Sequence, residues 1–149
     1  MRDRARLPLM KSLAAVQRAQ RASAEAQLFA AQAAEAAARS AEDEARATAA
    51  EAERHWLDHL AAPGFSPEYG RALSERLIGR HDEANIAAEH LRTATGLRSR
   101  READWQKGEA RVRLSEASVR RLKRRIDRRA EENRMSELAD RVTYSWSRS

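Results

Sequence analysis

The residue types best suited to metal chemistry gather where three histidines lie near an aspartate. His55 and His59, in the segment HWLDH, are four residues apart and would share one face of a helix. With His81 approaching from a second helix and Asp58 nearby, the group has the donor types of a zinc site. No neighbouring residues are placed to orient the imidazoles by hydrogen bonding. We therefore expect solvated histidines beside a loop, and predict no metal and no cofactor.

A second group with binding potential is the basic segment, residues 120–129. Its cations are Arg120, Arg121, Lys123, Arg124, Arg125, Arg128 and Arg129. Such a cluster suits the phosphates of nucleic acid or of an anionic membrane. However, the cations surround the helix, Asp127, Glu131 and Glu132 are interspersed or follow directly, and no nucleic-acid-reading motif accompanies them. A charged partner protein is therefore preferred, with a basic adaptor for nucleic acid or an anionic membrane surface as the alternative.

A third group is aromatic and aliphatic and surrounds residues 61–67. It comprises Trp56, Leu57, Leu60, Phe65, Tyr69, Leu73 and Leu77. Some of these side chains must close the end of a helical hairpin. Seven large apolar residues exceed what two helix ends can bury, so a binding surface is also expected there. We predict that Trp56, Leu60, Tyr69 and Leu73 form an exposed patch.

Signatures of catalysis are absent from the sequence. It contains no G-x-x-x-x-G-K-[ST] phosphate loop, no G-x-S-x-G nucleophile motif and no H-E-x-x-H metal motif. A pair of long helices, predicted below, also lacks the concave pocket that shields catalytic groups from water. We predict that the protein is not an enzyme.

The composition is that of long helices. Of the 149 residues, 62 are hydrophobic, but 32 of these are alanine and only 30 carry a large apolar side chain. Thirty such residues cannot fill the core of a globular domain of this length. The abundant residues Ala, Leu, Arg, Glu and Gln are strong helix formers. An all-α protein is predicted and a compact α/β enzyme is excluded.

Cellular location and charge can also be predicted from the sequence. There is no cysteine for disulfides, and no apolar run approaches the ~20 residues of a membrane span. No secretory leader is recognised, so we expect a cytoplasmic protein without membrane insertion. The net charge is +6, but residues 98–129 carry an excess of +8 and residues 23–53 carry −5. The two stretches are therefore complementary to each other or to charged partners.

Two prolines and a glycine between Ala61 and Pro67 divide the chain. Ser66 followed by Pro67 is typical of an N-cap and the first position of a helix. We therefore predict one hairpin over residues 1–149, with a helix at 9–60, a loop at 61–67 and a helix at 68–146.

Heptad spacing predicts how the two helices pair. The first carries small residues at Ala24, Gln27, Ala31, Ala34, Ala38, Ala41, Ala45, Thr48 and Ala52. The second carries a strict period of seven at Leu77, Ala84, Leu91, Arg98, Trp105, Val112, Val119, Ile126 and Asn133. The companion heptad positions hold polar residues, namely Thr95, Glu102, Glu109 and Glu116. We therefore expect a seam with a single track, that is, one row of contact residues on this helix. An intramolecular, antiparallel two-helix coiled coil fits this pattern best.

The unequal helix lengths predict a C-terminal helical overhang. Pairing outward from Gly64 sets residue 9 opposite about residue 119, so about 27 residues after Val119 would extend alone. The overhang retains Leu122, Ile126, Met135, Leu138 and Val142 without a partner in their own chain. Such a stripe on a basic helix predicts docking of another protein.

The chain resembles the FliJ/YscO family of coiled-coil stalk proteins from flagellar and virulence type III secretion. The resemblance covers nearly the whole chain: an Ala/Gln-rich first helix, a loop near Gly64 and a basic second helix. Trp105, Arg111 and Leu122, followed by EENRMSELADR, are similar to the family's closing pattern of a tryptophan, a basic run and an acidic-hydrophobic tail.

The resemblance implies a non-enzymatic stalk whose paired termini enter a hexameric ATPase ring and whose tip side faces the export gate. Secretion chaperones are further expected partners, and the location is peripheral to the inner-membrane apparatus. The expected ATPase-binding residues are Arg120, Arg121, Leu122, Arg124, Arg125, Ile126, Arg128, Arg129, Met135 and Leu138. The expected export-gate-binding residues are Trp56, Leu60, Tyr69 and Leu73. Whether the system is flagellar or virulence-associated stays open.

Overall fold

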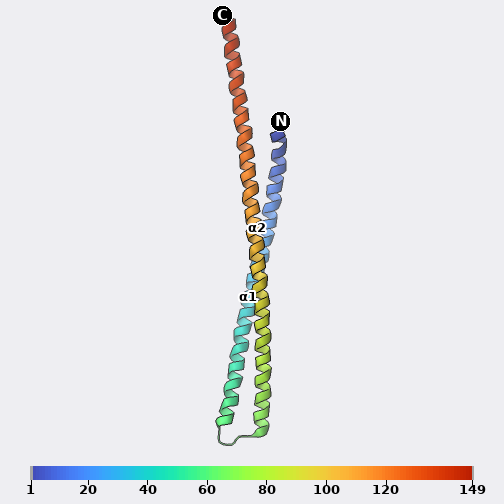
Figure 1. Cartoon of the computed structure of the whole chain (residues 1–149), viewed down its shortest axis with the longest axis vertical. Coiled ribbons are helices and arrows are strands. Elements are labelled where there is room, and N and C mark those ends of the chain that lie inside the picture. Colours follow the sequence, from blue (N-terminus) through green and yellow to red (C-terminus); the bar gives the residue numbers. More distant parts are fainter. Residues whose placement is uncertain (1, 149) are drawn as a thin grey trace. The chain divides into compact units, whose positions relative to one another are not determined.

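The computed structural model describes residues 2–148 and consists of two long helices (Figure 1). Helix α1 spans Arg2–Ala61 and helix α2 spans Pro67–Ser147. The two helices are joined by residues 62–66, and no strand occurs among the described residues. The predicted all-α, two-helix hairpin is confirmed. No helix in the described part of the chain is apolar over a length sufficient to cross a membrane.

Helix α1 begins earlier than the predicted residue 9. It starts at Arg2, and Pro8 lies inside it. The missing N–H of Pro8 removes only one hydrogen bond, to the carbonyl of Arg4, close to the end of the helix. Asp3 in the first turn favours the positive end of the helix dipole. The predicted start at residue 9 is therefore wrong.

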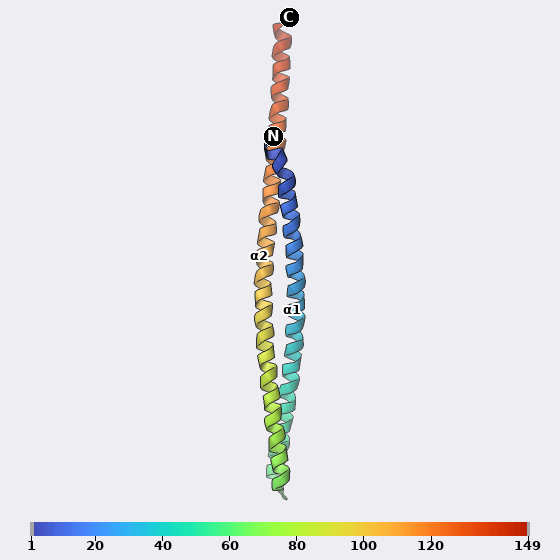
Figure 2. The same cartoon turned by 90° about the vertical axis from the view of Figure 1, so that its right-hand side faces the viewer.

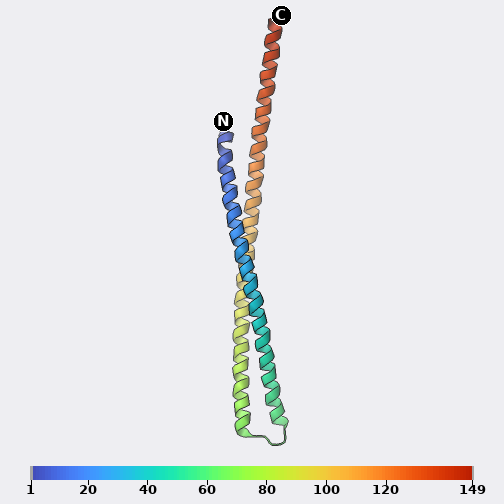
Figure 3. The same cartoon turned by 180° about the vertical axis from the view of Figure 1, so that it is seen from behind.

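The chain divides into two compact units, each containing part of both helices. The loop unit is Glu25–Asp104, and it includes the connection between α1 and α2 (Figure 3). The terminal unit consists of Met1–Ala24 and Trp105–Ser149, of which residues 2–24 and 105–148 are described. Each unit has its own interhelical seam.

In the loop unit, the seam of α1 combines alanines with two glutamates. Its buried or half-buried positions are Leu28, Ala31, Glu35, Ala38, Glu42, Ala45, Ala49, Ala52, Trp56 and His59. The predicted alanines at 31, 38, 45 and 52 are confirmed. The predicted companions Gln27, Ala34, Ala41 and Thr48 are wrong, because they are exposed and the next residue in the chain takes each place. Leu28 buries more apolar area than Gln27, and Glu35 finds a charged partner.

The seam of α2 has two tracks, although one was predicted. The period of seven is confirmed from Leu77 to Ile126, whereas Asn133 is exposed. The second track lies three residues after the first and consists of Leu73, Arg80, Ala87, Ala94, Arg101, Gly108, Ser115 and Leu122. Only its two end members, Leu73 and Leu122, are large and apolar, which is why this track does not stand out in the sequence. The polar companion positions predicted from the sequence are only half-buried and lie at the edge of the seam: Thr95, Glu102, Glu109 and Glu116.

Glu35 links the two helices of the loop unit. Its Oε2 lies 2.8 Å from Nε of Arg98, and the hydroxyl of Thr95 donates a hydrogen bond of 3.1 Å to its Oε1. Arg98 also contacts Glu102 at 2.7 Å. Alanine side chains are small and alike, so their packing alone does not fix the register. These polar contacts therefore determine which residues of the two helices lie opposite each other.

Candidate protein-binding surfaces

Three interhelical ion pairs fix the register of the terminal unit. Asp3 pairs with Arg129 at 2.7 Å, Arg18 with Glu116 at 3.5 Å and Arg21 with Glu109 at 3.1 Å. These pairs place Leu9 and Met10 at the level of Leu122. The sequence predicted that residue 9 lies opposite residue 119, which is about one turn too early in α2. The register differs because it follows these ion pairs.

The predicted overhang consequently starts later than Val119. Leu122 and Ile126 are half-buried against α1, so the prediction that they lack a partner is wrong. From residue 131 to residue 148 every residue is exposed, and α2 remains helical to Ser147, beyond the start of α1 (Figure 2). We call residues 131–148 the C-terminal extension. It carries the predicted ATPase-binding residues Met135 and Leu138, both exposed.

The cations of the basic segment are exposed, and most of them have no acidic partner. Arg129 pairs with Asp3, and Arg120 lies 4.0 Å from Glu116. The remaining ones make no ion pair with any residue that the structure describes: Arg121, Lys123, Arg124, Arg125 and Arg128. Five positive charges within eight residues are therefore available to an acidic partner.

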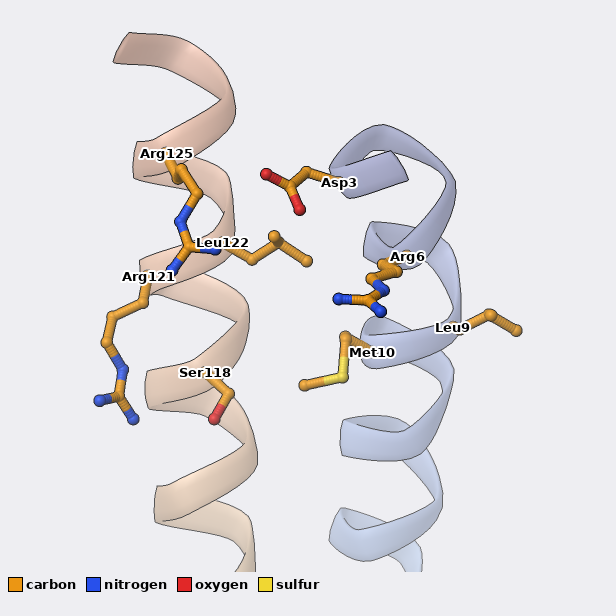
Figure 4. Close-up of a pocket in the computed structure, with 8 residues that line it drawn as sticks. All are labelled: Asp3, Arg6, Leu9, Met10, Ser118, Arg121, Leu122 and Arg125. Atoms are coloured by element: carbon orange, nitrogen blue, oxygen red, sulfur yellow. The ribbon is translucent and has the colours of Figure 1, made fainter. Parts of the chain in front are cut away.

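An open groove lies beside the seam of the terminal unit (Figure 4). It has a volume of about 490 Å³ and is lined by Asp3, Arg6, Leu9, Met10, Ser118, Arg121, Leu122 and Arg125. Met10 and Leu122 point into the space between the helices, whereas Leu9 lies at the outer edge and points away from α2 (Figure 4). The groove thus has an apolar floor and arginines on both walls.

The apolar character of this side continues beyond the groove. Leu13 and Val16 follow Leu9 at spacings of four and three, and Leu114 precedes Ser118 by four, so each shares a helix face with a groove residue. All three side chains are exposed, Leu114 to 65%. We call the groove together with Leu13, Val16 and Leu114 the apolar trough.

The other side of the same seam is lined mainly by charged residues. A smaller groove of about 300 Å³ is lined there by Lys11, Ala14, Arg18, Glu116, Val119 and Arg120. It contains the Arg18–Glu116 ion pair. The trough could not be predicted from the heptad positions that lie between the helices. The only sequence signal for it is the spacing of Leu9, Leu13 and Val16 by four and three residues, which indicates a second apolar face on α1.

The predicted export-gate patch is only partly exposed. Leu60 and Tyr69 are exposed, Trp56 is half-buried, and Leu73 is 7% exposed. The prediction of an exposed patch is wrong for Leu73, because its place four residues before Leu77 puts it in the interhelical seam. The exposed large apolar side chains near the loop are Leu57, Leu60, Phe65 and Tyr69, which we call the tip surface.

A compact set of contacts holds the tip surface in place. Ser66 Oγ accepts the backbone N–H of Tyr69 at 3.4 Å, which confirms the predicted N-cap. The carbonyl of Ser66 accepts a hydrogen bond from Nε2 of His59 at 3.1 Å, and the His59 ring lies 5.2 Å from Phe65 and 4.8 Å from Tyr69. Gly64 has a φ of 106°, which favours glycine. The loop is therefore an ordered connection.

The histidines have roles other than those of a zinc site. His59 caps the loop, and His55 lies 3.9 Å from Glu51, one turn earlier on α1. Within residues 2–148 no group of three or more His, Cys, Asp or Glu side chains is arranged to hold a metal ion.

Comparisons with protein families, with characterised proteins and with solved structures return no match for this chain.

Proposed function

We propose that this protein is a non-enzymatic central stalk and escort of a type III secretion export apparatus, coupling a hexameric ATPase to an export gate. It would act in the cytoplasm, at the periphery of the inner-membrane apparatus. The observation that carries the proposal is the terminal unit, where five unpaired cations adjoin exposed apolar side chains. The FliJ/YscO-like order of sequence features supplies the identity of the partners.

The two components of this surface have different physical roles. Unpaired arginines steer an acidic partner and set its register, while contributing less to the net affinity. Burial of Met135, Leu138 and the trough residues contributes about 25 cal/mol for each Å² removed from water. A ring with acidic side chains and an apolar sleeve around its pore satisfies both requirements.

The loop unit supplies the second contact of the proposed stalk. Leu57, Leu60, Phe65 and Tyr69 present aromatic and aliphatic surface at the turn, held by the His59 contacts. Aromatic side chains at such sites are typical binding anchors. We assign the export gate to this tip surface, and secretion chaperones as further partners of the protein.

The proposal is tested by ATPase binding and stimulation. A chain truncated after Ala130 loses the C-terminal extension but keeps the Asp3–Arg129 pair and the seam residues Leu122 and Ile126. We expect it to stay helical and to lose most stimulation of the ATPase. Arg121→Glu with Arg125→Glu should weaken binding at least tenfold, whereas Arg71→Glu, an exposed arginine of the loop unit, should not. Full binding by both altered proteins would contradict the proposal.

The alternative, an adaptor for nucleic acid or an anionic membrane, is favoured by the same unpaired arginines. Binding to phosphates weakens steeply as salt concentration rises, because counterions are released. Docking of an apolar surface depends little on salt. Titration of the protein with duplex DNA and with anionic vesicles at about 50 and 200 mM salt therefore separates the two functions.

A further inference from the structure

The C-terminal extension carries an apolar stripe without a partner in the described chain. Met135, Leu138, Val142 and Trp146 are spaced by three, four and four, which places them on one face of the helix. All four are exposed, Trp146 to 80%. The stripe therefore has the periodicity of a helix that packs against other helices.

The apolar trough has the same spacing in reverse order. On its α2 wall, Arg125, Leu122, Ser118 and Leu114 are separated by three, four and four residues. We propose that a second copy of this chain occupies the trough: the extension of each copy lies antiparallel to α2 of the other. The inference goes beyond the proposed function and involves no ATPase.

A single register satisfies the whole stripe. With Leu138 placed opposite Leu122 of the other copy, Val142 meets Ser118 and Trp146 meets Leu114. Met135 then lies beside the aliphatic part of Arg125, which lines the trough. On the α1 side, Leu9, Leu13 and Val16 lie at similar levels and form the outer edge of the trough, where they border the stripe.

Symmetry favours a second copy as the occupant. In an antiparallel arrangement, contact of Leu138 with Leu122 of the other copy implies the reciprocal contact. One two-fold axis, near residue 130, therefore fills both troughs and covers both stripes, as in isologous dimers. An unrelated helix in the trough would leave the stripe exposed.

Charge also fits this register. The extension carries the acids Glu131, Glu132, Glu137 and Asp140. In the same alignment these lie at the levels of Arg129, Arg128, Lys123 and Arg120 of the other copy. Lys123 and Arg128 are without an acidic partner among the described residues. The opposing charges add long-range attraction and select the antiparallel orientation.

The expected buried area is that of a weak dimer. The described extension has 18 residues and is about 27 Å long, and a helix presents a face about 10 Å wide. Reciprocal docking covers four such faces, together roughly 1,000 Å². This lies at the lower limit for specific association, so the dimer should dissociate on dilution.

Sedimentation equilibrium of the full chain tests the proposal between about 1 and 200 μM, where a weak dimer of this size would dissociate. We expect a monomer–dimer equilibrium. Leu138→Asp and Leu114→Asp, at exposed positions on the stripe and in the trough, should each weaken the dimer at least tenfold. Ile86→Asp, an exposed aliphatic residue of the loop unit, should have no effect. Circular dichroism verifies that each variant stays helical.

Disulfide trapping tests the register, because the natural sequence has no cysteine. Ser118→Cys and Val142→Cys in one chain lie 24 residues apart on one helix, about 36 Å, and cannot bridge within a copy. We expect a covalent dimer from the double variant and none from either single variant. A monomer at every concentration, or covalent dimers from the single variants, would overturn the proposal. Neither result bears on ATPase binding, which the truncation after Ala130 tests separately.

Discussion

Asp3 of α1 and Arg129 of α2 are 126 positions apart in the sequence, yet Nη1 of the arginine lies 2.7 Å from Oδ2 of the aspartate. Asp3 is buried, although it belongs to the first turn of its helix. The pair marks the end of the two-helix part of the terminal unit: beyond residue 130, α2 has no neighbour among the described residues. The pair thus lies at the boundary between the basic segment, which runs beside α1, and the C-terminal extension, which has no neighbouring helix.

Removal of this charge should loosen the start of α1. Asp3→Asn keeps the shape of the side chain but eliminates the ion pair, worth about 0.5–1 kcal/mol. We expect the amides of residues 6, 7, 9 and 10 to exchange their hydrogens about two- to fivefold faster, because local opening becomes easier. Exchange in the loop unit should be unchanged. Asp43→Asn, at an exposed position without an ion pair in the described chain, is the matched control. Equal exchange in both variants would show that the pair does not hold the helix end.

Glu35 should be the most sensitive acidic position of the loop unit. Glu35→Ala leaves Arg98 without its 2.8 Å partner in a half-buried seam, at a cost of about 2 kcal/mol. Urea unfolding followed by circular dichroism measures the loss, with the exposed Glu25→Ala as control. Replacing both partners, as Glu35→Leu with Arg98→Leu, should restore most of the stability, because the charges left behind, on Glu102 and Arg39, are exposed enough to be solvated. A double variant as unstable as Glu35→Ala would contradict this account.

Two glycines of α2 should respond differently to substitution by alanine. A Cβ at Gly96 meets no atom within 4 Å, so Gly96→Ala gains helix propensity and should stabilise the protein by about 0.5–1 kcal/mol. A Cβ at Gly70 would lie 3.1 Å from Cε2 of Phe65, which must move away from the helix. We expect Gly70→Ala to be less stable than Gly96→Ala by about 1 kcal/mol, because the ring contacts are disturbed. Thermal unfolding of both variants checks the difference, and equal stabilities would refute it.

The tip surface should be separable from the fold. Leu60→Ala with Tyr69→Ala removes exposed side chains, so we expect reduced binding to the export gate and reduced secretion with less than about 1 kcal/mol lost in stability. Leu73→Ala, at a buried position, should instead cost about 2–3 kcal/mol. Secretion and thermal unfolding measured together distinguish the two effects. Unimpaired secretion by the stable double variant would place the gate contact elsewhere.

The fold could be predicted because its signals are local. Pro63, Gly64 and Pro67 stop one helix and start the next, and the period of seven from Leu77 to Ile126 gives the paired face of α2. The companion track was missed because Gly108 and Ser115 are small or polar and stand out only against a partner helix. The overhang was misplaced for a different reason: its start depends on Asp3 meeting Arg129, a contact between the two ends of the sequence.

The candidate surfaces were predicted less completely for the same physical reason. The basic segment is visible in the sequence as a charge cluster, and its exposure follows from solvation of arginine. Whether Leu73 or Tyr69 faces solvent depends on the rotation of α2 about its axis, which neighbouring seam residues such as Leu77 determine. The trough requires two helix faces from opposite ends of the sequence to lie side by side, and no single stretch of sequence contains that information.

The three tryptophans lie in different surroundings and give the protein three spectroscopic reporters. Trp56 is half-buried in the loop unit, Trp105 is half-buried in the terminal unit with its Nε1 shielded from solvent, and Trp146 lies exposed on the extension. Indole fluorescence shifts to shorter wavelength in apolar surroundings. A chain that retains only Trp146 would therefore emit like a solvated indole when the extension is free, and the blue shift on docking would time its engagement. Chains retaining only Trp56 or Trp105 would follow the opening of each unit without interference from that event.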